Sequence, residues 1–309
     1  MSEFLTLNDG RKLGFIDSGK PEGLPVFLFH GTPGSRIFGF EEEPLVQKEG
    51  LRIITPERPG YGLSDAKKNR ELRDYCCDIE QLADHLDIEQ FHVSGVSGGG
   101  PYALACANWL SNRVLTVTLI ASATPVDMKG FSKGMSAGNR LAFSISRYIP
   151  SLLKPIYLYS SWVVRKKPEK LIEGLESQLC QWDRNTLNEL KANGKIEIFL
   201  AHIREAYRNG YFGAYSDMLL LAKPWKIDFQ SLSVPIIMWH GEADTLMPIT
   251  PAKAFSKILP GCECHFIKDA GHLLLESEEF SRQIISRLKA HPPDILSGKE
   301  KTAADNPEL

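Results

Sequence analysis

The stretch from His92 to Ala107 constrains the fold of this chain more than any other. Its sequence, HVSGVSGGGPYALACA, begins in a short apolar run of strand length around Val93. It continues from Tyr102 to Leu110 as an Ala- and Leu-rich segment typical of a buried helix. The stretch therefore predicts a strand, a sharp turn and a helix, with Ser97 at the turn.

The turn carries the pattern G-x-S-x-G, with Ser97 between Gly95 and Gly99. A serine at the tip of such a strained turn needs neighbours without Cβ atoms, so that the strand and the helix can approach closely. Pro101 falls in the first helical turn, where a missing N–H costs nothing. Ser97 is therefore a candidate nucleophile. A glycine-rich turn with an incidental serine is the alternative.

Length and charge narrow the choice of partner. A chain of 309 residues can form one large domain, or a core with an inserted subdomain, and either can bury an extensive interior. Charged residues make up 24% of the chain and the formal net charge is −2, so composition points neither to nucleic acid nor to an anionic membrane. We expect a small, largely apolar molecule as the partner.

The first residues, the longest apolar runs and the cysteines indicate the cellular location of the protein and whether it binds a metal. Residues 1–4 lack the basic start and apolar core of a signal peptide, and no apolar run reaches the length of a membrane span. We therefore expect a cytoplasmic protein. Cys262, Cys264 and His265 form only a weak metal pattern, because these residues would alternate between the faces of a strand. We expect no metal and no cofactor.

Short apolar runs alternate with helix-period segments in the first part of the chain. An Asn8-Asp9-Gly10 turn favours a hairpin, and an amphipathic helix is expected over residues 72–86. Strands that alternate with helices imply an α/β fold with a doubly wound, mostly parallel sheet. Strands are expected at residues 4–7, 12–16, 25–29, 51–55, 91–96 and 114–121.

The pattern changes after residue 124. No strand is evident from about Pro125 to Leu221, where aromatic and aliphatic residues recur at helical spacing. Strands resume at 234–239 and 262–267, with a helix expected to start near Thr250 as its N-cap. We predict a core formed by residues 1–124 and 222–293, a helical insertion at 125–221, and a disordered tail at 294–309.

Three residues could complete a catalytic triad. A serine hydroxyl is a weak nucleophile until an imidazole takes its proton, and the imidazole needs a carboxylate to fix its tautomer. Ser97, Asp244 and His272 each lie just beyond a predicted strand, in the order Ser, Asp, His. The carboxyl ends of parallel strands meet at one edge of a sheet, where ligands bind.

Other residues compete for these roles. Among eight histidines, only His272 combines a post-strand loop, a preceding glycine and a place after Asp244. Glu242 and Asp127 also follow predicted strands and remain alternatives to Asp244. The other histidines fall in His-Gly turns (His30, His240), on helices (His85, His202) and within strands (His92, His265).

The tetrahedral intermediate of acyl transfer carries its charge on the former carbonyl oxygen, which must meet preorganised donors. Backbone N–H groups can supply them. Gly98 follows the nucleophile at a helix N-terminus, and Thr32 follows the His30-Gly31 turn. We expect these two amides to form the oxyanion hole.

Five motifs together resemble the α/β-hydrolase superfamily: HGTPG at 30–34, RPGYGLSD at 58–65, GVSGG at 95–99, HGEAD at 240–244, and Gly271-His272. The resemblance covers nearly the whole chain outside the tail. It implies a helical cap over the site at residues 125–221. It also implies Ser97 as nucleophile, Asp244 as acid and His272 as base.

The resemblance leaves the reaction open. Ser97 argues against haloalkane dehalogenases and epoxide hydrolases, which use Asp at this position. The HGTPG loop is similar to that of proline iminopeptidases, but Val96 and Gly98 differ from their usual elbow, and Glu57 stands where relatives often have a structural Asp. A peptidase would need cap carboxylates for the substrate ammonium, with Glu173, Glu176, Glu205 and Asp217 as candidates.

We therefore expect a serine hydrolase, and within that class a carboxylesterase for small or medium acyl esters that works through an acyl-enzyme on Ser97. A ligand-binding signalling protein with a retained triad is the alternative from another class. An iminopeptidase-like peptidase, a C–C bond hydrolase and a cofactor-free haloperoxidase are further alternatives, because one fold hosts many reactions.

Overall fold

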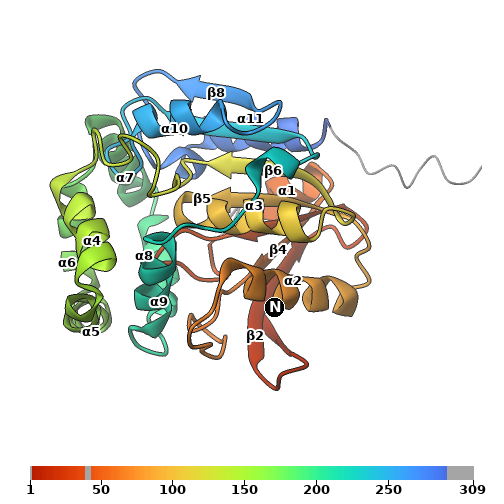
Figure 1. The fold of residues 1–309 in the computed structure, drawn as a ribbon, viewed down its shortest axis with the longest axis horizontal. Helices are drawn as coiled ribbons and strands as arrows, with labels where there is room; N and C mark the ends of the chain where they lie inside the picture. Colours follow the sequence, from red (N-terminus) through yellow and green to blue (C-terminus); the bar gives the residue numbers. More distant parts are fainter. Residues whose placement is uncertain (1, 39–42, 291–309) are drawn as a thin grey trace, which may run out of the picture.

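The computed structural model describes residues 2–38 and 43–290, so the predicted tail at 294–309 lies outside the described residues. Its centre is one sheet with the strand order β1-β2-β4-β3-β5-β6-β7-β8 (Figure 1). The strands are β1 (Ser2–Thr6), β2 (Lys12–Gly19), β3 (Leu24–Phe29), β4 (Leu51–Pro56), β5 (Phe91–Val96), β6 (Val114–Ile120), β7 (Ile236–Gly241) and β8 (Glu263–Ile267).

The sheet is parallel except at one edge. β1 pairs with β2 and β2 with β4 in antiparallel fashion, whereas the pairs from β4 through β3, β5, β6 and β7 to β8 are all parallel. The prediction of a doubly wound, mostly parallel sheet is confirmed. The carboxyl ends of β3, β5, β7 and β8 consequently open on the same edge.

Two hydrophobic layers cover the two faces of this sheet, as the alternation along β3 shows. Phe27 and Phe29 pack with the helices α2 (Leu72–His85), α3 (Gly100–Trp109) and α10 (Ile249–Ser256). Val26 and Leu28 belong to the opposite layer, with α1 (Glu43–Lys48) and α11 (Glu278–Leu288). Because successive side chains of a strand point to opposite faces, a strand buried on both sides reads as a continuous apolar run.

Six α-helices lie in sequence between β6 and β7: α4 (Ala137–Tyr148), α5 (Leu153–Lys166), α6 (Pro168–Glu176), α7 (Gln181–Ala192), α8 (Ile196–Ala206) and α9 (Phe212–Leu221). Figure 1 shows α4, α5 and α6 at one end of the molecule, with α8 and α9 between them and the sheet. Within the described ranges, no helix combines the length and the apolar character needed to cross a bilayer.

The structure corrects the expected start of α10. The helix begins at Ile249 with Pro248 as its N-cap residue, so Thr250 lies inside the first turn and is not the cap. Pro251 occupies the third helical position, where the backbone N–H would lack an intrahelical acceptor in any case. A proline is therefore tolerated there, and the Thr-Pro pair marks the first turn but not the boundary.

Candidate active site

Ser97 lies at the tip of the turn between β5 and α3. Its φ of +52° is a left-handed conformation that residues with side chains rarely adopt. A Cβ on Gly95 would lie 2.6 Å from the carbonyl oxygen of Gly99, so the strand and the helix approach too closely for a side chain there. Pro101 falls in the first turn of α3. The strand, turn and helix expected from the sequence are all present.

Asp244 and His272 form a buried acid–base pair beyond β7 and β8. His272 Nδ1 lies 2.7 Å from Asp244 Oδ2. The other oxygen, Oδ1, accepts hydrogen bonds from the backbone N–H groups of Leu246 and Met247, both at 2.8 Å. These two bonds fix the carboxylate so that Oδ2 faces the imidazole. The Asp244 side chain is fully buried, and that of His272 is 10% exposed.

The surroundings of His272 favour its charged form. Burial lowers the pKa of this imidazole, but the charge of Asp244 and its hydrogen bond outweigh burial and raise the pKa to about 9. Asp183 on α7 adds a smaller contribution of the same sign. In the part of the chain that the structure describes, Ser97 Oγ makes no hydrogen bond with His272. Such contacts often tighten only when substrate binds.

The competing carboxylates lie elsewhere. Glu242 is exposed and pairs with Lys253 at 2.6 Å, and Asp127 is exposed after β6. Neither is in contact with His272, whereas Asp244 is. The structure thus brings together the two residues that the sequence analysis favoured.

The other histidines lie where the sequence predicted. His30 and His240 bond to backbone carbonyl groups of their own turns, at 2.8 and 2.6 Å. His265 on β8 stacks on Trp239, with ring centroids 4.0 Å apart, and lies 2.7 Å from Glu263. These contacts account for the three rings as structural elements.

The loop after β3 lies against the Ser97 turn. A Cβ on Gly31 would be 3.5 Å from Ser97 Cβ, and a Cβ on Gly98 would be 2.4 Å from Thr32 Oγ1. The two amides expected to form the oxyanion hole, those of Thr32 and Gly98, therefore belong to residues packed against each other beside the serine. Glycine at position 98 leaves the space that this close approach requires.

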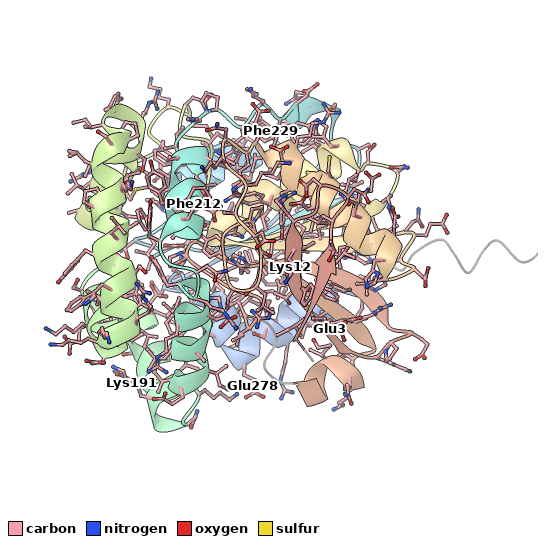
Figure 2. All side chains as sticks on the ribbon, turned by 90° about the horizontal axis from the view of Figure 1, so that it is seen from below. Glu3, Lys12, Lys191, Phe212, Phe229 and Glu278 are labelled. Carbon is pink, nitrogen blue, oxygen red and sulfur yellow. The ribbon has the colours of Figure 1, made fainter. Side chains whose placement is uncertain are left out.

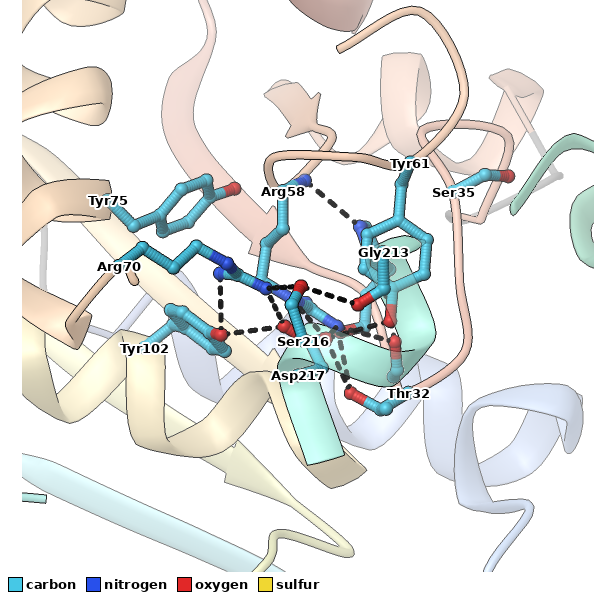
Figure 3. Close-up of polar contacts among 12 residues, drawn as sticks. Thr32, Ser35, Arg58, Tyr61, Arg70, Tyr75, Tyr102, Gly213, Ser216 and Asp217 are labelled. Carbon is cyan, nitrogen blue, oxygen red and sulfur yellow. Dashed lines mark hydrogen bonds and ion pairs between the residues drawn. The ribbon is translucent and has the colours of Figure 1, made fainter. Parts of the chain in front are cut away.

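A cluster of buried charges lies directly behind this loop, and Figure 3 shows its side chains converging on Asp217 of α9. Asp217 Oδ2 accepts hydrogen bonds from Arg58 Nε and Nη2, at 2.8 and 2.6 Å, and from Thr32 Oγ1 at 2.8 Å. Oδ1 accepts from Tyr102 at 2.7 Å and from Arg70. Burial alone would raise the pKa of Asp217, but Arg58 and Arg70 hold it below its usual range.

Arg58 also fixes the backbone of the loop. Its Nη1 donates to the carbonyl oxygen of His30 at 2.5 Å, and its Nη2 donates to that of Gly31 at 2.7 Å. In a planar trans peptide, the C=O and the following N–H point in opposite directions. Holding the Gly31 carbonyl on Arg58 therefore sets the direction of the Thr32 N–H.

Sequence reasoning missed two groups of this site. It treated Asp217 as a possible ligand for a substrate ammonium, but in the structure two arginines, two tyrosines and Thr32 surround this carboxylate. It did not single out Asp183, whose Oδ1 accepts a hydrogen bond from the Leu273 N–H at 2.9 Å. Both acids lie in helices of ordinary pattern, so no local signal distinguishes them from surface residues. Arg58 and Tyr61, which both lie in the RPGYGLSD motif and both bond to Asp217, are the sequence signal that could have pointed to this cluster.

Comparisons with known proteins bear on the fold and the family of this chain. A family model described as "alpha/beta hydrolase fold" matches residues 25–143. YcgS of Bacillus subtilis (strain 168), an uncharacterized hydrolase, is 26% identical over 271 residues, which is 88% of this chain and 92% of that protein. A proline iminopeptidase of Neisseria meningitidis serogroup A is 25% identical over 319 residues, 96% of each chain.

A solved structure has the same fold. The thermophilic esterase from Thermogutta terrifontis superposes with a TM-score of 0.68 at 24% identity, covering 94% of this chain and 97% of that one. The chain has the fold of the α/β-hydrolase superfamily.

Proposed function

We propose that the protein is a serine hydrolase that cleaves carboxylic esters through an acyl-enzyme on Ser97. The observation that carries the proposal is the 2.7 Å contact between His272 Nδ1 and a fully buried Asp244, at the sheet edge where Ser97 stands on a left-handed turn. A histidine oriented in this way presents Nε2 to a nucleophile.

The proposed reaction uses three side chains and two backbone N–H groups of the chain. Ser97 Oγ attacks the ester carbonyl carbon while His272 Nε2 takes the hydroxyl proton, and Asp244 stabilises the imidazolium. The former carbonyl oxygen, now negative, accepts hydrogen bonds from the N–H groups of Thr32 and Gly98. The imidazolium then gives its proton to the leaving alcohol. Water, deprotonated by His272, hydrolyses the acyl-enzyme and restores the Ser97 hydroxyl.

Helices α4 to α9 are proposed as the cap over this site. Leu221 supports the assignment for α9, because its Cδ1 would lie 3.2 Å from a Cβ on Gly98. Asp183 on α7 reaches the loop that carries His272. Side chains of this segment thus approach both the Ser97 turn and the loop that carries His272. Such a cap would enclose a small, largely apolar substrate. The cytoplasmic location remains a prediction.

The carboxylates available to a peptidase argue for an ester substrate. An aminopeptidase must leave an acidic group free for the substrate ammonium, because an unpaired buried charge is costly. Asp217 is fully engaged, Glu205 lies 2.6 Å from Arg36, and Glu176 pairs with Lys191. Glu173 is exposed on α6. No candidate is both buried and unpaired among the four, so we favour the neutral acyl ester.

Reaction with a fluorophosphonate probe, followed by intact-mass analysis, tests the proposal. We expect stoichiometric labelling of the wild type, none of Ser97→Ala, and full labelling of Ser94→Ala, which changes a buried serine on β5, the strand that leads to Ser97. A series of p-nitrophenyl esters measures turnover, which should fall roughly 10³-fold or more in Ser97→Ala. Near-normal turnover in that variant would refute the assignment. Labelling without turnover of any ester would favour the ligand-binding alternative.

A further inference from the structure

The helices α4 and α5 expose an unusual number of large hydrophobic side chains. Eight of the eleven exposed large hydrophobic residues among the described residues fall between positions 141 and 162. We call these eight the α4–α5 surface: Leu141, Tyr148, Ile149, Leu152, Ile156, Leu158, Tyr159 and Trp162.

The apolar residues of α5 occupy two opposite faces. Leu153 and Val164 are fully buried and hold the helix on its neighbours. Tyr159 and Trp162 belong to the outer face, where they are 66% and 49% exposed, and their rings stack with centroids 6.0 Å apart. The packing of α5 on its neighbours therefore does not explain why its outer face carries large hydrophobic side chains. In Figure 2 the light-green helices of this region form the left edge of the molecule, and side chains project outward from it.

The same segment is strongly basic. Residues 128–168 contain eight Lys or Arg residues and no Asp or Glu, in a chain whose net charge is −2. All eight are exposed, and none of them forms an ion pair with any residue that the structure describes. The whole-chain charge conceals this concentration. The eight cations are Lys129, Lys133, Arg140, Arg147, Lys154, Arg165, Lys166 and Lys167.

Exposed apolar side chains together with a concentration of positive charge favour some binding partners over others. A second copy of the chain would bring eight more positive charges against these eight, and like charges at an interface oppose association. An outward face of Trp, Tyr, Leu and Ile beside Lys and Arg is instead the composition of helices that lie in the interfacial region of an anionic bilayer. We propose that the α4–α5 surface docks the protein peripherally on anionic lipid membranes.

The proposed docking has two components that respond differently to conditions. Trp162, Tyr159 and the aliphatic residues enter the headgroup region, and the cations are attracted to the lipid phosphates. Salt screens the second component and leaves the first. We therefore expect binding that needs anionic lipid and weakens as ionic strength rises.

Vesicle sedimentation of the full chain tests the proposal. We expect the wild type to pellet with phosphatidylcholine vesicles that contain phosphatidylglycerol, and to stay in the supernatant with pure phosphatidylcholine. Binding should fall at about 0.5 M NaCl, where the screening length is only a few ångströms. Equal binding to both vesicle types, or no binding to either, would overturn the proposal.

Two pairs of variants locate the surface. The double change Tyr159→Ser and Trp162→Ser should weaken partitioning about tenfold or more, whereas Ile258→Ser, an exposed apolar residue outside the surface, should not. Lys154→Glu with Lys166→Glu should weaken it by at least as much, whereas Lys257→Glu, on an exposed lysine elsewhere, should have little effect. Equal losses in the control variants would show that the attraction is not local to this surface.

Two further measurements distinguish a loss of membrane binding from misfolding and from self-association. Thermal unfolding and the fluorophosphonate labelling rate without vesicles show whether each variant remains folded, whatever the true substrate. Sedimentation velocity measures self-association. A wild-type dimer that Tyr159→Ser and Trp162→Ser converts to a monomer would overturn the membrane proposal in favour of an interface between copies.

Discussion

Asp183 on α7 accepts a hydrogen bond at 2.9 Å from the backbone N–H of Leu273, the residue directly after His272. A buried acid from the helical segment thus holds the loop that carries the candidate base. The same carboxylate contributes a negative charge that helps to raise the pKa of the imidazole. One side chain therefore acts on His272 both mechanically and electrostatically.

Substitution of Asp183 should separate these two effects. Asp183→Asn removes the charge but keeps an oxygen that can accept from Leu273, so we expect a folded protein in which the pKa of His272 is lower. Because the base acts in its neutral form, the rising limb of the activity–pH profile should shift to lower pH. Asp228→Asn is a matched control, because Asp228 also accepts a backbone N–H bond, from Gln230 at 3.1 Å. The pH dependence of kcat/KM for a p-nitrophenyl ester measures the shift, and an unchanged profile in Asp183→Asn would contradict the coupling.

The raised pKa of His272 predicts how wild-type activity depends on pH. Only the neutral imidazole can take a proton from Ser97, and the free enzyme holds it protonated below a pKa of about 9. We expect kcat/KM to rise by about tenfold per pH unit through the neutral range and to level off near that pKa. The labelling rate with a fluorophosphonate should follow the same curve. A flat profile across the neutral range would contradict a free-enzyme pKa near 9.

Replacement of Asp244 should lower turnover more than it shifts the profile. Asp244→Asn keeps the size of the side chain but removes the charge that stabilises the imidazolium and orients its tautomer. We expect turnover to fall by about 10⁴-fold, measured with the best p-nitrophenyl ester. Glu242→Gln, which changes the competing exposed carboxylate, should leave turnover near the wild-type level. If Glu242→Gln lost turnover and Asp244→Asn kept it, Glu242 and not Asp244 would be the acid of the triad.

The sequence contained enough information to predict the sheet and the local shape of the Ser97 turn. Buried parallel strands read as continuous apolar runs, and a strand, turn and helix within sixteen residues depends mainly on local sterics. Chain order fits Asp244 and Glu242 equally well, so the choice of Asp244 rested on the resemblance of the HGEAD motif, and the structure adds the contact with His272. That contact joins residues 28 positions apart, which local patterns do not encode.

The Asp217 cluster could not be predicted for the same reason. Its carboxylate lies 159 positions from Arg58 and 147 from Arg70, on a helix whose neighbours in sequence are mostly apolar. A single acid among apolar residues reads equally well as a substrate ligand or as a buried partner. The structure distinguishes these two interpretations, because the fold brings both arginines to the carboxylate on α9.

A side chain at Gly95 should break the turn. The Cβ of Gly95→Ala would lie 2.6 Å from the Gly99 carbonyl oxygen and 2.7 Å from Gly100 Cα, so β5 and α3 would have to separate. We expect a loss of about 1–3 kcal/mol in unfolding free energy, as for other overpacked sites. Gly174→Ala is the control, since its Cβ meets nothing within 4 Å and lies in a helix, where alanine is favoured. Urea unfolding measures both, and equal stability of the two variants would refute the steric argument.

Removal of the Asp217 charge should affect both stability and the transition state. Asp217→Asn leaves Arg58 and Arg70 buried without a counter-charge, which costs about 3–5 kcal/mol when such a pair is broken. Because Arg58 sets the direction of the Thr32 N–H, the surviving folded enzyme should lose on the order of 10²-fold in kcat with little change in KM. Glu57→Gln tests the specificity of this effect: Glu57 is equally buried beside Arg36, but it does not bond to the loop after β3 at Gly31 or Thr32. We expect Glu57→Gln to lower the urea midpoint without the selective loss of kcat. A proportional loss of kcat in both variants would mean that Asp217 only stabilises the fold.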